Sequence, residues 1–119
     1  MDWVLDGQLQ VVTSPEIVLE YREVMRRDKF RRHGFPPQWL DFLIDESFAL
    51  PDPEPWPVPL PDRKDAPFLA LAHAAGAWLI SGNLKHFPEA ARSGVKVLSP
   101  GEFLAGLEGG NPPQMPPGR

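Results

Sequence analysis

The chain has 119 residues, of which 42% are hydrophobic and 24% charged, and its formal net charge is -4. These values predict one small domain with a core of ordinary size, and the absence of cysteine excludes a disulfide framework and a thiolate zinc site. We expect a cytoplasmic protein, because the start lacks the pattern of a secretory leader and the longest apolar run, residues 68–80, is too short to cross a bilayer.

A strand and a helix are the first predicted elements, and they follow one another directly. Residues 9–13 are rich in β-branched side chains, which favours a strand. Ser14 and Pro15 then have the pattern of a helix N-cap and a first helical residue. Apolar residues recur at helical spacing to about residue 27, and Glu20 lies beside this apolar stripe.

Basic residues gather at the end of this helix. Six of the twelve lysines and arginines lie in a short segment, at positions 22, 26, 27, 29, 31 and 32. Such a run of charges is usually an exposed and solvated surface. The alternative is a surface that contacts RNA phosphates, and its candidate residues are Arg26, Arg27, Arg31 and Arg32.

The middle and the end of the chain are marked by proline. After a predicted helix over residues 37–47, proline stands at every second position from 51 to 61, which removes alternate amide donors. We interpret this segment as a stiff surface connection. The last residues, 108–119, are rich in glycine and proline, and we expect them to be disordered.

The segment "DRKDAPFLALAHAAGAWLISGNLKHF", residues 62–87, predicts a buried helix followed by a strand. Pro67 can stand only in the first turn of a helix, so the helix begins near Asp65, and Gly76 ends it. Residues 77–81 then form a strand, which Asn83 follows. For Asp65 taken by itself, a simple helix cap is a better interpretation than a site residue.

The remaining predicted elements are a helical turn, a strand and a helix, over residues 88–92, 95–98 and 100–107. Strands that alternate with helices predict an α/β fold with a parallel sheet, which binds ligands beyond the carboxyl ends of its strands. Ser14, Ser81 and Asn83 lie at such ends. Glu20 and Asp65 could converge with them on one polar pocket.

Four segments of the chain resemble those of PIN domains, a family that includes toxin components of toxin-antitoxin pairs. They are "VVTSPEIVLEYREVM", "DAPFLALA", "ISGNLKHF" and "VKVLSPGEFLAGL", and their order, spacing and local structure all agree with the family. The resemblance implies a three-layer PIN-like α/β domain over residues 1–107, with helices flanking a short central parallel sheet.

The same resemblance implies an endoribonuclease that depends on Mg²⁺ or Mn²⁺. Glu20 and Asp65 fall on metal-ligand positions, and Asn83 completes the implied catalytic set. Further residues fall near the site, namely Asp62, Ser14, Ser81 and His86. The implied partners are an RNA substrate, a cognate antitoxin and a second copy of the chain, with no membrane.

The start of the chain departs from the family pattern. PIN domains open with a central strand that ends in the first metal-binding Asp, and this segment is missing here. Asp2 and Asp6 are the only early acids, and we assign neither to the site. With two carboxylates left, we expect weak cation binding and little ribonuclease activity. The alternative function is a non-catalytic module that binds an antitoxin-like partner or RNA.

Loss of the middle strand would leave a gap in the predicted sheet. Each buried backbone group without a partner costs about 1 to 3 kcal/mol. The strand over residues 9–13 could shift to close the gap, a second chain could insert, or the isolated protein could be marginally folded. We expect the first of these in a compact structure, and self-association or poor solubility in solution.

Overall fold

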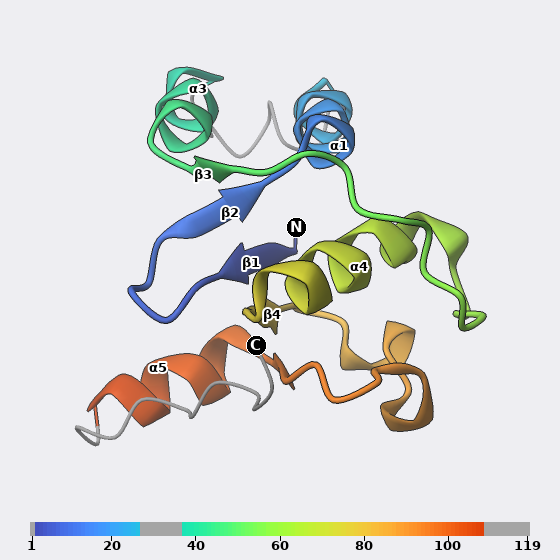
Figure 1. Ribbon diagram of the computed structural model, residues 1–119. Coiled ribbons are helices and arrows are strands. Elements are labelled where there is room, and N and C mark those ends of the chain that lie inside the picture. Colours follow the sequence, from blue (N-terminus) through green and yellow to red (C-terminus); the bar gives the residue numbers. More distant parts are fainter. Residues whose placement is uncertain (1, 27–36, 109–119) are drawn as a thin grey trace.

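A computed structural model describes residues 2–26 and 37–108, and it shows a sheet flanked by helices (Figure 1). The strands are β1 (Trp3–Leu5), β2 (Val11–Thr13), β3 (Phe48–Ala49), β4 (Trp78–Ile80) and β5 (Val97–Leu98). The α-helices are α1 (Pro15–Met25), α3 (Pro37–Asp45), α4 (Ala66–Ala75) and α5 (Pro100–Glu108). Short 3-10 turns cover Arg63–Asp65, Leu84–His86 and Glu89–Ala91. Residues 109–119 of the predicted tail, and Arg27, Arg31 and Arg32, lie outside the described residues.

The five strands form one sheet in the order β3-β2-β1-β4-β5. β2 pairs with β3, and β4 with β5, in parallel. β1 pairs with β2 on one side and β4 on the other, both times antiparallel. The predicted α/β class with a PIN-like sheet is confirmed, and its middle strand runs against the other four.

β1 fills the position in the sheet where the sequence predicts a gap. The expectation that the strand over residues 9–13 would shift into this gap is wrong, because β2 stays beside the middle strand. β1 runs antiparallel because a short loop can join only antiparallel neighbours, whereas parallel ones need a long crossover. Asp6 shapes this loop, since its Oδ1 accepts hydrogen bonds from the backbone N–H groups of Gln8 and Gln10.

The sheet lies between two apolar layers. On one face, Val4, Val12 and Leu79 belong to the main core with α1 and α4, and all three are at most 1% exposed. On the other face, Trp78 and Phe103 of α5 pack in a second cluster, with ring centroids 5.7 Å apart. This alternation follows from the period of two along a strand, and it gives the three layers predicted.

The helix boundaries that the sequence predicts from capping residues are confirmed. Ser14 precedes α1, and its hydroxyl accepts a hydrogen bond from the N–H of Ile17 at 3.5 Å. α4 ends at Gly76, which adopts the left-handed conformation with φ 63°. Between them, the proline-rich segment is attached to the domain by Trp56, whose indole N–H donates to the carbonyl of Ala91 at 3.0 Å.

No helix among residues 2–26 and 37–108 combines the length and the apolar character needed to cross a membrane.

Candidate functional site

Three strand ends meet at one edge of the sheet. β2 and β4 end there, and β1 begins there because it runs in the opposite direction. Trp3 pairs with Ile80, so Asp2, just before β1, lies next to Ser81, just after β4. Ser14 follows β2 at the same edge. Ser14 and Ser81 are 2% and 1% exposed, so this edge holds buried polar groups.

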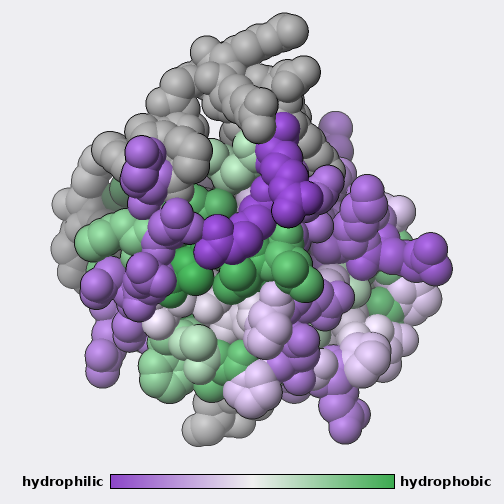
Figure 2. All heavy atoms as spheres, turned by 90° about the horizontal axis from the view of Figure 1, so that it is seen from above, coloured by the Kyte–Doolittle hydropathy of each residue, from purple (hydrophilic) through white to green (hydrophobic). Residues whose placement is uncertain are grey.

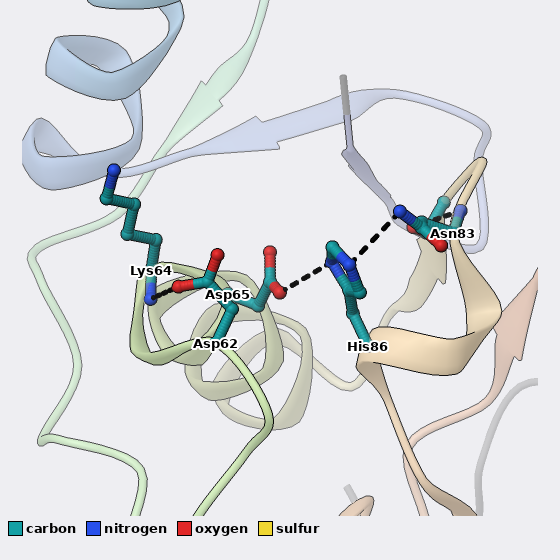
Figure 3. A network of polar contacts seen from close by, with 6 residues as sticks. Asp62, Lys64, Asp65, Asn83 and His86 are labelled. Atoms are coloured by element: carbon teal, nitrogen blue, oxygen red, sulfur yellow. Dashed lines mark hydrogen bonds and ion pairs between the residues drawn. The ribbon is translucent and has the colours of Figure 1, made fainter.

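Asp65 stands at the start of α4 but does not cap it. The Asp65 side chain makes no capping hydrogen bond. Its Oδ2 is buried and has no hydrogen-bond partner within the described part of the chain. Nδ1 of His86 lies 2.9 Å from this oxygen, a distance that suits an ion pair although the geometry is not that of a hydrogen bond. The carboxylate therefore faces His86 and not the helix amides (Figure 3).

His86 is held on its other side by Asn83. Nε2 of His86 lies 3.1 Å from Nδ2 of Asn83, and the backbone N–H of Asn83 donates to Oγ of Ser81 at 3.0 Å. These contacts join β4, the turn after it and the start of α4 into one polar cluster, which brings together Asp65, Ser81 and Asn83 of the predicted convergence, together with His86. Figure 3 shows His86 between Asp65 and Asn83.

Asp62 contributes to this cluster through its charge. Its Oδ1 accepts a hydrogen bond from the backbone N–H of Lys64 at 2.9 Å, which caps the 3-10 turn before α4. Burial raises the pKa of Asp65, His86 opposes this shift, and the charges of Asp2 and Asp62 raise the pKa further. Asp62 thus has a local structural task and also an electrostatic effect on Asp65.

Asp2 lies in this cluster, although the sequence analysis assigns it to no site. The hydroxyl of Tyr21, a fully buried residue of α1, donates to the backbone carbonyl of Asp2 at 2.8 Å and so fixes the start of β1. Burial raises the pKa of Asp2, while a hydrogen bond with Ser81 and the charge of His86 lower it. Asp2 is therefore a second half-buried carboxylate within electrostatic reach of Asp65.

A sequence signal for the position of Asp2 does exist. Asp6 and Gly7 lie between two apolar runs, and an Asp-Gly pair in this setting is a strong hairpin signal. In such a hairpin the residue before the first strand lies beside the residue after the second. The pair does not fix the register, because a two-residue turn at Asp6 and Gly7 would pair Leu5 with Gln8. In the structure Leu5 pairs with Val11, and this longer loop places Asp2 near Ser14 at the carboxyl end of β2.

Glu20 is not brought into contact with the cluster. It is half-buried on α1, and among the described residues no hydrogen bond or ion pair joins it to Asp65 or Asp2. In the predicted basic patch, the two described arginines have acidic partners. Arg22 pairs with Asp41 at 2.8 Å, and Arg26 with a glutamate one turn before it at 3.4 Å.

The donor set at this edge suits a hydrated Mg²⁺ ion but not a closed metal site. Within residues 2–26 and 37–108, no group of three or more His, Cys, Asp or Glu side chains is arranged to hold a metal. Mg²⁺, however, prefers oxygen ligands, keeps several waters and is often held by one or two carboxylates. The buried oxygen of Asp65, which lacks a hydrogen bond, and the carboxylate of Asp2 meet this lower requirement.

An open pocket of about 470 Å³ lies beside the start of α4. The proline-rich segment forms much of its wall, and Arg63, Ala66 and Ala70 at the start of α4 form another part. Neither Asp65 nor His86 lines it. We therefore assign the candidate site to the polar sheet edge.

Comparison with known families agrees with this architecture. The model of the PIN domain family matches residues 1–85, well over half of the chain. The chain belongs to the PIN domain family. The matched part contains Glu20, Asp65, Ser81 and Asn83, whereas His86, β5 and α5 lie beyond it. Neither a curated protein nor a solved structure matches the chain.

Proposed function

We propose that this protein is a PIN-type endoribonuclease that depends on Mg²⁺ or Mn²⁺ and acts as the toxin of a toxin-antitoxin pair. One observation supports the catalytic part of the proposal most directly. Asp65 stands where a helix cap would be expected, yet it makes no capping hydrogen bond and turns its buried Oδ2 toward Nδ1 of His86, 2.9 Å away. A residue that served only to start the helix would accept hydrogen bonds from the helix amides.

The residues of the sheet edge can be given separate roles. Asp65 and Asp2 would hold the cation beside Asn83, and Glu20, which makes no contact with this cluster, is kept as a candidate from the family resemblance. A divalent ion at this place supplies charge neutralisation for a phosphate and a more acidic water. Ser81 fixes the backbone of Asn83 through the 3.0 Å hydrogen bond. We propose residues 1–107 as the unit that carries this activity.

We expect the activity to be low. Two carboxylates bind Mg²⁺ more weakly than three or four, because each removed ligand takes a negative charge and a fixed oxygen from the site. A scissile phosphate would also be positioned less well for in-line attack, and positioning is a large part of catalysis of phosphoryl transfer.

The test is cleavage of a fluorescent single-stranded RNA by the purified 119-residue chain. We expect slow cleavage in millimolar Mn²⁺ or Mg²⁺, none in EDTA, and a loss of about 100-fold or more in Asp65→Asn. Glu102→Gln, which changes an exposed acid on α5, is the matched control and should cleave like the unmodified chain. Glu20→Gln with unchanged activity would remove Glu20 from the site.

Cleavage that persists in EDTA or in Asp65→Asn would refute the proposed ribonuclease. The same conclusion follows if the folded protein leaves RNA intact at saturating Mn²⁺. In the second case the alternative, a non-catalytic binding module, becomes the better description of the chain.

One observation favours that second candidate function. Leu19 of α1 and Phe42 of α3 are 69% and 63% exposed, the highest values among the large apolar side chains described. Figure 2 looks onto the molecule from the side where α1 and α3 lie in Figure 1, and it shows apolar side chains gathered between polar ones. Exposed apolar side chains of this size on two neighbouring helices are ones that a partner could cover, here an antitoxin-like helix or a second copy.

Light scattering after size-exclusion chromatography tests this face. If it binds a second copy, the unmodified chain should elute as a dimer, and Leu19→Ser combined with Phe42→Ser as a monomer. If it binds an antitoxin, the chain alone should be monomeric, and only a co-expressed antitoxin should co-elute with it, again depending on both side chains. A monomer that binds no partner through these residues would contradict the binding module.

A further inference from the structure

The strongest additional signal in the molecule is the position of His86. Its Nδ1 lies 2.9 Å from Oδ2 of Asp65, a buried oxygen for which no other partner is found among the described residues. A cation that used this oxygen as a ligand would have to approach it from open space, and the imidazole stands directly beside it (Figure 3).

Asn83 holds the ring in this orientation. Its Nδ2 lies 3.1 Å from Nε2 of His86, and an amide nitrogen can only donate, so Nε2 accepts in the neutral ring. The proton of neutral His86 is then on Nδ1, the nitrogen that faces Asp65. The imidazole therefore presents a positive edge to the carboxylate, as a bound cation would.

The charges in the cluster also indicate that His86 takes the place of a cation. Burial disfavours the charged forms of both Asp65 and Asp2, and the charge of Asp2 adds to the effect at Asp65. His86 acts against burial at both carboxyls. Among the described residues with a resolved effect on these carboxyls, His86 alone lowers the pKa of both Asp65 and Asp2.

The exposure of the two partners shows which one can move. The side chain of Asp65 is 14% exposed, whereas that of His86 is 38% exposed and stands on the short 3-10 turn Leu84–His86. His86 can turn toward solvent without leaving a cavity in the core. Asp65, fixed at the start of α4, cannot leave the cluster in this way.

We propose that His86 acts in place of a counter-ion at the candidate site: its imidazole, with Nδ1–H toward Asp65, occupies the position of a divalent cation, and a cation binds only when His86 turns away. This inference rests on the proposed metal-dependent function, because it concerns the same carboxylates. It makes His86 a residue that limits cation affinity and not a cation ligand.

The test is Mn²⁺ binding, measured by electron paramagnetic resonance, in the full chain and in His86→Ala. We expect His86→Ala to bind Mn²⁺ about tenfold more tightly, since the competing group is gone. Lys85→Ala is the matched control, because it removes a positive charge from the same turn without touching Asp65. Adding Asp65→Asn to His86→Ala should abolish the gain.

Weaker or unchanged Mn²⁺ binding in His86→Ala would overturn the proposal, and so would an equal gain in Lys85→Ala, which would indicate a general effect of charge. Nitrogen-15 NMR of the unmodified chain provides a second measurement. The imidazole signals of His86 should change to those of a solvated histidine as Mg²⁺ saturates the site. Signals that stay constant at saturation would also overturn it.

These outcomes are separable from those of the proposed ribonuclease. If His86→Ala gains Mn²⁺ affinity but no variant cleaves RNA, the ribonuclease proposal fails and the counter-ion role stands. If the unmodified chain cleaves RNA in Mn²⁺ and His86→Ala gains no affinity, the counter-ion role fails and the ribonuclease proposal stands.

Discussion

The helices α4 and α5 both begin with a cap-type residue and a proline in the first turn, but their polar side chains make different contacts. At α5, Oγ of Ser99 accepts from the N–H of Glu102, and Oε1 of Glu102 accepts from the N–H of Ser99, each at 3.0 Å. This is a capping box, in which both side chains satisfy helix amides. At α4, the carboxylate of Asp65 makes no such bond and faces His86.

The difference separates a stabilising start of a helix from one that costs stability. Burial disfavours the charged form of Asp65, and the side-chain capping hydrogen bond before α4 comes from Asp62 instead. Helix stability alone therefore does not explain an Asp at position 65. Its orientation toward His86 agrees with the role proposed for Asp65 at the sheet edge.

The largest expected difference between the starts of α4 and α5 is in Mn²⁺ affinity. We expect Asp65→Asn to weaken Mn²⁺ binding at least tenfold, because it removes one of two carboxylates of the proposed site. Glu102→Gln should leave the affinity unchanged, since Glu102 lies on the start of α5. Isothermal calorimetry measures both. Equal affinity in Asp65→Asn and the unmodified chain would exclude Asp65 as a ligand.

For thermal stability, the substitution at the start of α5 should have the larger effect. Ser99→Ala removes the hydroxyl that accepts from the N–H of Glu102, and we expect a loss of about 1 kcal/mol, or roughly 4 to 8 °C in Tm for a domain of this size. Asp65→Ala removes no capping bond and should not lower Tm.

Ser99→Thr keeps a hydroxyl and serves as the control for the first change. A drop in Tm for Asp65→Ala as large as that for Ser99→Ala would show that Asp65 supports the helix after all.

Local signals in the sequence were sufficient for the helices. Ser14 with Pro15, Pro67 and Gly76 each restrict the backbone by their own chemistry, and the helices begin and end where these residues predict. The middle strand could not be predicted in this way. β1 has three residues, and its place between β2 and β4 depends on pairing with residues far along the chain.

The same contrast applies to the site. The strand end predicted the place of Asn83 and the helix start that of Asp65, whereas His86 was indicated only by the resemblance to PIN domains. Asp2 was missed because the expected ligand belonged to a parallel strand that ends at the site, whereas β1 is reversed and begins there. Spacing could not show whether Asp65 caps its helix, because that depends on which way a side chain turns.

A smaller expected difference between the starts of α4 and α5 is in how the stability of the fold depends on pH. Burial raises the folded-state pKa of Asp65 above 3.8, so the folded protein holds this proton more tightly than the unfolded chain. Stability from this group is therefore greatest at low pH and falls as pH rises through the folded-state pKa. Asp65→Asn should have a higher Tm than the unmodified chain at pH 7 and an equal one below about pH 3.8. A difference that grows on acidification would contradict this sign.

Glu102 should show the reverse dependence and the smallest effect. Hydrogen bonds with the backbone and side chain of Ser99 lower its pKa below 4.5 in the folded protein, so the unfolded chain binds this proton more tightly. The resulting stability is present above pH 4.5 and is lost as pH falls through the lowered folded-state pKa. Glu102 is fully exposed to water, and solvent screening keeps the effect small. Glu102→Gln can still accept a hydrogen bond from Ser99 but cannot titrate. As the pH falls from 5 to 3, the Tm of this variant should therefore rise relative to that of the unmodified chain. Over the same range the Tm of Asp65→Asn should fall toward that of the unmodified chain. Thermal melts of both variants at matched ionic strength would detect these two opposite trends in Tm. If the two variants instead changed in the same direction, the starts of α4 and α5 would not have the opposite pKa shifts on which the prediction rests.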